Sequence, residues 1–308
     1  MSAGVTVSPA APAEQAAALR RAFAHLDPEA RLARVAVGLD LLARGDLDPA
    51  GVLVARAGGA VVGAMVAAPV PGAGAAVWPP AADDPAAADA LVRHAADWLR
   101  GRGVKLAQAL LAPEETGLAG PLLRGGFAHA TTLHYLRHYL ELPTDLFAGP
   151  ERLTYTPFAA ADPAAFAAAL GRTYEGTADC PEVSGARTPA EALAGHQSGG
   201  FDPDRWWLAD AAGERVGVLL VNTAPADEGW EVAYVGVVPE HRRRGHGREL
   251  MAKALWEAKA AGQPFLALAV DERNRPARAL YRRLGFEPYE RREVLLAVWD
   301  GGSALAGG

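Results

Sequence analysis

The chain repeats itself once, and this duplication constrains its fold more than any other feature of the sequence. Landmark residues of the first half recur 159 positions later without a gap, as the pairs Pro80/Pro239, Leu91/Leu250, Gly103/Gly262 and Gly126-Phe127/Gly285-Phe286. Because glycine and proline mark turns, several matches at one offset indicate a shared backbone. A length of 308 residues also suits two domains. We therefore expect domains at residues 1–145 and 146–300, with a boundary near Pro143–Pro150 and a disordered tail at 301–308.

The two halves also predict the same order of elements. In the first half, the pattern predicts two strands joined by a turn at 51–69, a helix at 84–103 and a strand at 106–112. In the second half it predicts a hairpin, a strand, a helix, a strand and a short helix, at 206–221, 232–238, 247–261, 264–270 and 274–284. The agreement supports a tandem duplication.

The composition limits the cellular compartment and the classes of binding partner that we expect. The net charge is −6, so no overall basic surface for nucleic acid is expected. The single cysteine, Cys180, excludes an intramolecular disulfide and fits a reducing compartment. Without a signal sequence or an apolar run of about 20 residues, the sequence predicts a cytoplasmic protein that does not insert into membranes. No metal site is expected, because His134 and His138 fall on a predicted strand, where positions four apart do not converge.

A loop rich in glycine and arginine connects the strand at 232–238 to the following helix. Gly245 and Gly247 let a ligand approach the backbone, and the first N–H groups of a helix lack internal partners. Arginines at 242, 243, 244 and 248 add positive charge, which suits a pyrophosphate. The loop is not a Walker loop, since no Gly-Lys-Ser/Thr follows, and not a dinucleotide fingerprint, since the third glycine is missing. Taken alone, such a loop is more typical of an ordinary strand–helix turn with solvated charges.

The wider pattern resembles the GNAT superfamily of acetyltransferases. Arg242–Gly247 matches the family's acetyl-CoA motif, a Gln or Arg followed by spaced glycines after a hydrophobic strand. Asn274, Tyr281 and the Leu284-Gly285-Phe286 run match its next motif, and the resemblance covers roughly residues 206–298. It implies an α+β fold with two tandem GNAT-like units, each a mixed, mostly antiparallel sheet flanked by helices. It also implies acetyl-CoA as co-substrate.

The resemblance further implies roles for individual residues. Tyr281 is the expected acid for the leaving thiolate, and Glu231 is the expected base for the amine. The implied acetyl-CoA contacts are Val237, Val238, Arg242, Arg243, Arg244, Gly245, His246, Gly247, Arg248 and Asn274. Each of these residues has a structural alternative: Tyr281 as a packing residue, Glu231 as a solvated carboxylate and Asn274 as a helix N-cap.

The first half lacks this set of residues. The offset places Asp83 at the position of Arg242, Ala88 at that of Gly247 and Leu122 at that of Tyr281. We therefore expect a degenerate first domain that is structural or helps to shape the acceptor site, and an active second domain. Residues 173–207 are either the acceptor-binding segment, through Tyr174, Asp179, Glu182 and Arg187, or an ordinary connection.

The expected activity is transfer of an acetyl group to a primary amine of a small molecule or peptide by direct attack. Two alternatives stay open on the sequence. One is a transferase that uses another acyl-CoA, such as succinyl-CoA. The other is a non-catalytic sensor or interaction module that binds acyl-CoA. Retention of Tyr281 favours an enzyme.

Overall fold

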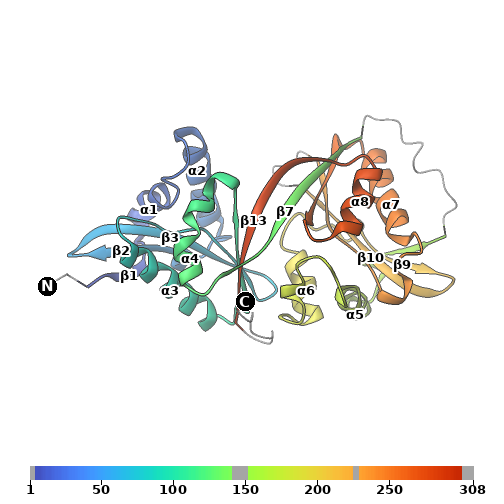
Figure 1. Ribbon diagram of the computed structural model, residues 1–308, viewed down its shortest axis with the longest axis horizontal. Coiled ribbons are helices and arrows are strands. Elements are labelled where there is room, and N and C mark those ends of the chain that lie inside the picture. Colours follow the sequence, from blue (N-terminus) through green and yellow to red (C-terminus); the bar gives the residue numbers. More distant parts are fainter. Residues whose placement is uncertain (1–3, 141–151, 225–228, 300–308) are drawn as a thin grey trace. The chain divides into compact units, whose positions relative to one another are not determined.

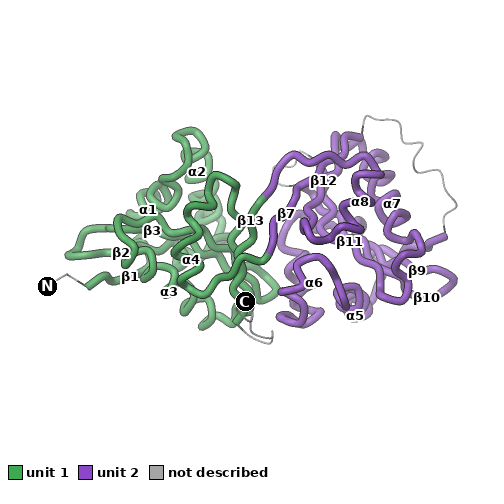
Figure 2. Tube along the Cα trace, viewed as in Figure 1, with its two compact units in different colours: residues 1–130, 292–308 green, residues 131–291 purple. Residues whose placement is uncertain are grey.

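The computed structural model describes residues 4–140, 152–224 and 229–299 (Figure 1). The chain forms two compact units, one of residues 1–130 and 292–308 and the other of residues 131–291 (Figure 2). We call them unit 1 and unit 2. Within the described ranges, no helix has the length and apolar character needed to cross a membrane.

Unit 1 consists of a sheet and its covering helices. Its strands run in the order β1-β2-β3-β4-β6-β13, and only β4 and β6 are parallel. Its elements are β1 (Thr6–Pro9), α1 (Gln15–Ala22), α2 (Pro28–Arg44), β2 (Val52–Ala57), β3 (Ala60–Val70), β4 (Gly74–Val77), β5 (Ala81–Ala82), α3 (Pro85–Gly101), β6 (Leu106–Leu111), α4 (Gly120–Arg124) and most of β13 (Glu287–Val298).

Unit 2 has the same plan. Its strands run β8-β9-β10-β11-β12-β7, and only β11 and β12 are parallel. Its elements are β7 (Ala128–Tyr139), β8 (Thr154–Pro157), α5 (Pro163–Tyr174), α6 (Pro189–His196), β9 (Trp206–Ala211), β10 (Glu214–Thr223), β11 (Trp230–Val237), α7 (His246–Ala260), β12 (Phe265–Asp271) and α8 (Arg275–Arg283). Two mixed, mostly antiparallel sheets with helices confirm the predicted α+β class.

Each unit takes its final strand from the other half of the sequence. In unit 2, β7 pairs antiparallel with β12 over Leu133–Tyr139 and Phe265–Asp271. In unit 1, β13 pairs antiparallel with β6 over Glu293–Val298 and Leu106–Leu111. The compact units therefore do not coincide with the ranges 1–145 and 146–300. The expected boundary at Pro143–Pro150 and the tail at 301–308 lie outside the described residues.

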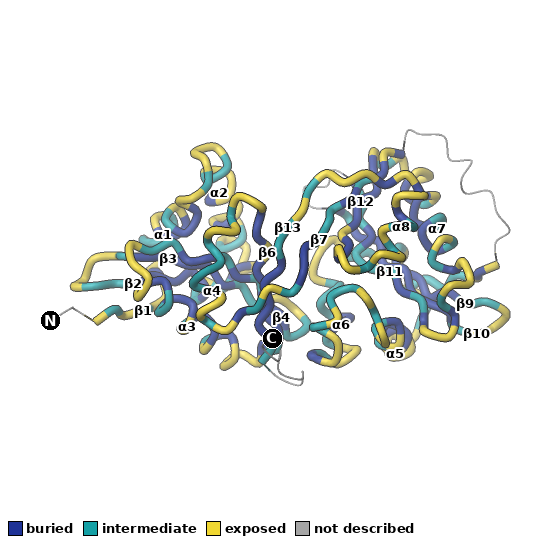
Figure 3. The backbone as a smooth tube through the Cα atoms, in the orientation of Figure 1, coloured by how far each residue is buried: buried dark blue, intermediate teal, exposed yellow. Residues whose placement is uncertain are grey.

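The predicted hydrophobic stripes form the cores of both units. In α7, Leu250, Ala254, Leu255 and Ala258 are fully buried against the sheet. The corresponding stripe of α3, with Leu91, Ala95 and Leu99, is buried in unit 1. Helix α2 is much less covered, with only Val35 and Gly38 buried among its 17 residues (Figure 3). The hairpin turns also fall where glycine permits positive φ, at Gly58-Gly59 and Gly213.

Candidate active site

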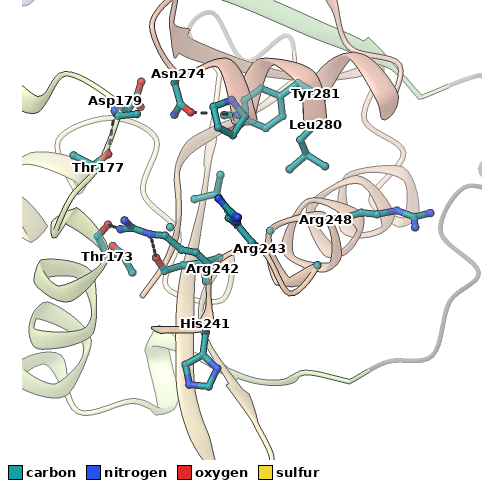
Figure 4. Close-up of a pocket in the computed structure, with 18 of the residues that line it drawn as sticks. Thr173, Thr177, Asp179, His241, Arg242, Arg243, Arg248, Asn274, Leu280 and Tyr281 are labelled. Atoms are coloured by element: carbon teal, nitrogen blue, oxygen red, sulfur yellow. Dashed lines mark hydrogen bonds between the residues drawn. The ribbon is translucent and has the colours of Figure 1, made fainter. Parts of the chain in front are cut away.

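Unit 2 contains a cavity of about 740 Å³ beside the glycine-rich loop (Figure 4). The end of β11 and the loop after it form one wall, and the first turn of α7 and one side of α8 form others. Thr173, at the end of α5, and the loop residues 176–179 complete the lining. The sequence motifs thus converge on one hollow with residues from the connection that follows α5.

Strand β11 opens away from its parallel neighbour along the cavity. Only Trp230, Glu231 and Val232 pair with β12, whereas β11 continues to Val237. The opening follows a β-bulge, because Leu220 of β10 pairs with Tyr234 and Val221 with Val232, which leaves one residue of β11 unmatched. Bulges bend a strand and end its pairing, so the bulge gives a local cause for the gap.

The open edge of β11 presents backbone groups to the cavity. The Val238 N–H donates to the Val216 carbonyl, at 3.0 Å, on the β10 side. Successive backbone N–H groups of a strand point to opposite sides, so the Val237 N–H points to the open side. Val237 lines the cavity, while Val238 is buried and does not. Of the two predicted backbone contacts, the geometry favours Val237 alone.

The first turn of α7 is open to the cavity. Gly245 occupies the N-cap position with a φ of 92° and supplies no side-chain cap. Gly247 lies in the first turn, and a Cβ added there would have only Leu280 Cδ2 nearby, at 3.7 Å. The protein itself therefore leaves the space over Gly247 free, and the helix N-terminus with its uncapped N–H groups faces it.

Four arginines bring positive charge to the cavity lining, namely Arg242, Arg243, Arg248 and Arg283. Arg242, Arg243 and Arg248 were expected, whereas Arg283 was not. Arg244 and His246, both expected to contact the ligand, are not among the lining residues. His246 is instead buried, and burial lowers the pKa of its ring.

Arg242 lines the cavity, and its guanidinium also binds backbone carbonyl oxygens of the protein. Its guanidinium donates to carbonyl oxygens of Val237, Thr173 and Gly176, at 3.0, 3.0 and 2.9 Å, and to that of Glu175. The C-terminal carbonyls of a helix lack intrahelical partners and attract cations. Arg242 therefore braces the open end of β11 against the end of α5 (Figure 4).

Tyr281 and Asn274 approach the cavity from α8. Tyr281 is 7% exposed, and burial, with the nearby negative charge of Asp179, raises the pKa of its phenol. The hydroxyl thus keeps its proton at neutral pH. Asn274 is the N-cap of α8, since its side chain accepts a hydrogen bond from the Ala277 N–H at 3.2 Å, and it also lines the cavity.

Glu231 is separate from these groups. It lies before the bulge, on the part of β11 that pairs with both β10 and β12, and it does not line the cavity. Burial raises the pKa of its carboxyl. The carboxylate that does line the cavity is Asp179, in the loop after α5. Of the four candidate acceptor residues, Tyr174, Asp179, Glu182 and Arg187, only Asp179 is in the lining.

Thr173 and Tyr234 are lining residues that the sequence analysis missed. The Thr173 hydroxyl donates to the Leu170 carbonyl at 2.7 Å, and it lies 3.0 Å from the Tyr234 hydroxyl. Because Thr173 has a single hydroxyl hydrogen, Tyr234 is the donor in their contact. The alternation of side chains along β11 was a signal that could have identified Tyr234 as a lining residue. The bulge, however, shifts the register of the strand, and it was not visible in the sequence.

Comparisons with known proteins place the chain in a family. The sequence matches the acetyltransferase (GNAT) family over residues 172–286. It is 32% identical over 227 residues to a mycothiol acetyltransferase of Thermomonospora curvata, covering 68% of this chain and 73% of that one. It is 41% identical over 90 residues to a mycothiol acetyltransferase of Streptomyces bingchenggensis, where the match spans 29% of each chain. The layout likewise resembles the tandem enzyme mycothiol synthase.

Solved structures agree on the fold. A GCN5-related N-acetyltransferase from Sphaerobacter thermophilus aligns with a TM-score of 0.65 at 19% identity, covering 99% of this chain and 98% of that one. A tandem GNAT protein from the clavulanic acid biosynthesis pathway aligns with a TM-score of 0.53 at 19% identity, covering 96% and 98%. With the relative from Thermomonospora curvata matched over most of its length, the chain belongs to the GNAT acetyltransferase family.

Proposed function

We propose that the protein is an acetyl-CoA-dependent N-acetyltransferase whose reaction takes place in unit 2. The observation that carries this proposal is the shared cavity of the uncapped α7 N-terminus, the open edge of β11 and Tyr281. Any one of these features is common in proteins. Their combination suits a ligand with an anionic end and a reacting carbonyl.

The residues present fit acetyl-CoA. The free N–H groups of the first α7 turn and the guanidinium groups of Arg243 and Arg283 suit its phosphates, whereas the Arg248 side chain points away from the other lining side chains (Figure 4). The vacant volume over Gly247 lets those phosphates approach the backbone. The Val237 N–H is a fixed donor for the acyl oxygen, and such a donor contributes about 3–4 kcal/mol when it is aimed at developing negative charge. Bound acetyl-CoA would supply the activated acyl group.

Tyr281 is the residue proposed to protonate the leaving sulfur. Its raised pKa keeps the phenol protonated, and its position in the cavity puts a donor beside the open strand. This feature favours an enzyme over a non-catalytic acyl-CoA sensor, because binding alone does not require a proton donor at that position. A carboxylate must also take the proton of the amine, and Glu231 and Asp179 are the two candidates.

The proposed acceptor is a primary amine. The relatives named mycothiol acetyltransferase point to a cysteinyl amine on a sugar, and we take an N-cysteinyl amino sugar as the test compound. Peptide amines are the alternative class. Transfer of a longer acyl group, such as succinyl, is a second candidate for the donor.

The decisive experiment combines binding and turnover. Isothermal titration calorimetry should find a single acetyl-CoA site per chain, and mass spectrometry should find acetylated product with the cysteinyl sugar. Two equal sites would contradict an inactive unit 1. Acetyl-CoA binding without product from any amine in a broad panel would instead support a non-catalytic sensor. Faster transfer from succinyl-CoA would identify succinyl-CoA, rather than acetyl-CoA, as the acyl donor.

A further inference from the structure

Asp179 and Glu231 are the two candidates for the catalytic base in unit 2, and they differ in whether they line the cavity. Asp179 lines the cavity together with Tyr281 and Tyr234. Glu231 lies outside the lining, on the paired part of β11. A group that receives a proton from the acceptor must come within hydrogen-bond reach of the amine. On this geometric criterion Asp179 is the better placed of the two.

Asp179 is held by a reciprocal exchange with the end of β12. Its Oδ1 accepts the Asp271 N–H at 2.9 Å, and Asp271 Oδ2 accepts the Cys180 N–H at 2.9 Å. The Asp179 N–H in turn donates to Thr177 Oγ1 at 3.0 Å. A carboxylate has two oxygens and can accept several hydrogen bonds. The exchange therefore fixes the loop through one oxygen of Asp179 and keeps acceptor capacity for a ligand.

A second set of contacts anchors the same loop. Arg273 donates to both Asp271 and Glu182, so a guanidinium is shared between two carboxylates. Asp271 is fully buried, and hydrogen bonds from Arg273 and Thr131 hold its pKa below the usual value although burial acts in the opposite direction. The ionised groups Asp271, Glu182, Arg273 and Asp179 then carry a summed charge of −2, which suits a cationic ligand.

Positive charge is also present, because Arg242 and Arg243 line the same cavity and the charge of Arg187 acts on Tyr174. The other titratable groups on the packed elements are uncharged at neutral pH. They are the phenols of Tyr281 on α8, Tyr234 on β11 and Tyr174 on α5, and the negative charge of Asp179 adds to the effect of burial in raising each of their pKa values. The thiol of Cys180 responds in the same way. Burial also raises the pKa of Asp179 itself, which makes it a stronger base than a solvated carboxylate.

We propose that Asp179 binds the acceptor as an ammonium ion and takes its first proton, in a step that rests on the proposed acetyltransferase function. The free amine then attacks the acyl carbon, so that the C–N bond forms and the C–S bond breaks. The sulfur takes the phenolic proton of Tyr281. The second proton of the nitrogen restores the Tyr281 hydroxyl, and Asp179 releases the first proton to solvent.

The test compares Asp179→Asn with Glu231→Gln on the N-cysteinyl amino sugar. Asn keeps an oxygen for the Asp271 N–H but cannot take a proton, so kcat/KM should fall at least about 100-fold at neutral pH. Affinity for acetyl-CoA should stay within about threefold, because the phosphates bind elsewhere in the cavity. Glu231→Gln should lose less than about tenfold, as expected for a carboxyl outside the cavity.

The pH dependence separates a base from a structural residue. Wild-type kcat/KM should be flat above the raised pKa of Asp179 and fall below it. In Asp179→Asn it should climb about tenfold per pH unit, because the amine must then lose its proton in solution. If Asn does not support folding, Asp179→Ser offers a smaller acceptor for the Asp271 N–H, and acetyl-CoA binding verifies the fold.

Several results would overturn the assignment. They are Asp179→Asn activity within threefold of wild type, a loss that does not recover at high pH, or a larger loss in Glu231→Gln. An inactive wild-type protein would contradict the proposed function instead, so the two failures are distinguishable.

Discussion

The two units begin their equivalent helices in opposite ways. In unit 1, Asp84 caps α3 by accepting the Ala87 N–H at 2.9 Å, and Pro85 removes another donor. In unit 2, Gly245 precedes α7 and provides no side-chain cap. One helix has a side-chain cap at its N-terminus, whereas the other has none. On the proposed function, this contrast accounts for a single acetyl-CoA site per chain, because a carboxylate of the protein already occupies the helix N-terminus in unit 1.

The two units also differ in the strand before this helix and in the residue at the position of Tyr281. Strand β4 ends at Val77, one residue after its last pair with β6, whereas β11 continues for five residues beyond its last pair with β12. Leu122, at the position of Tyr281, is fully buried in the core of unit 1. At these positions unit 1 has neither the long unpaired strand end nor the phenol of unit 2.

The largest effect should appear when the units are separated at different points. A fragment of residues 131–291 should fold, because β7 completes its sheet beside β12. A fragment of residues 146–300 lacks β7 and carries a β13 without β6, so we expect it to aggregate. Soluble yield and a cooperative thermal transition measure this. Equal folding of both fragments would mean that the exchanged strand is dispensable.

Replacing Tyr281 with Phe should lower kcat about 10²–10⁴-fold, because the proposed proton donor is lost. Affinity for acetyl-CoA should stay the same, since the ring that packs against Phe286 remains. Leu122→Met in unit 1 is a control of similar burial and should not change kcat. Rapid-mix and steady-state kinetics would measure both variants. Wild-type turnover in Tyr281→Phe would reduce the residue to packing.

Gly247→Glu should weaken acetyl-CoA binding at least about 100-fold, because a carboxylate would occupy the phosphate end of the cavity. The substitution imitates the acidic helix start of unit 1. Gly101→Glu adds the same side chain at the end of α3, where no atom lies within 4 Å, and should leave binding unchanged. Calorimetric affinities compare the pair. Undiminished binding in Gly247→Glu would place the phosphates elsewhere.

The smallest effect concerns the cap of α3. Asp84→Ala should destabilise unit 1 by about 1 kcal/mol, the usual cost of losing an N-cap side chain. It should not create a second acetyl-CoA site, because Pro85 and the buried Ala87 and Ala88 remain. Urea unfolding and calorimetry test the two halves of this prediction. A second binding event would show that Asp84 alone keeps unit 1 closed.

Local patterns predicted the central elements of both units, since each hairpin, helix and strand named from the sequence has a counterpart within two or three residues. Glycine and proline mark turns wherever they occur, so these signals survive without tertiary information. The exchange of β7 and β13 was not predictable in this way. Both strands follow a Gly-Phe pair and a short helix in their own half, and nothing local specifies which copy of the sheet each one joins.

The residues of the site likewise divide into those that local motifs identified and those that long-range contacts place. The loop, Tyr281 and Asn274 are contiguous motifs, and they do lie around one cavity. Arg242 also lines the cavity, but its hydrogen bonds to carbonyl groups of residues 173–176 depend on contacts that only the folded chain brings near. Asp179 is placed by bonds to Asp271, 92 positions away. Such long-range contacts have no signature in the local sequence.

The exchange of final strands also sets an order for completing the molecule during synthesis. Unit 2 already holds all its strands once β12 and α8 have left the ribosome, because β7 was made earlier. In unit 1, although its first strand begins at Thr6, β6 pairs with β4 but gains its second neighbour only when residues 293–298 have been made. The N-terminal unit is therefore finished last, and a premature stop near the end of the message would damage the beginning of the protein.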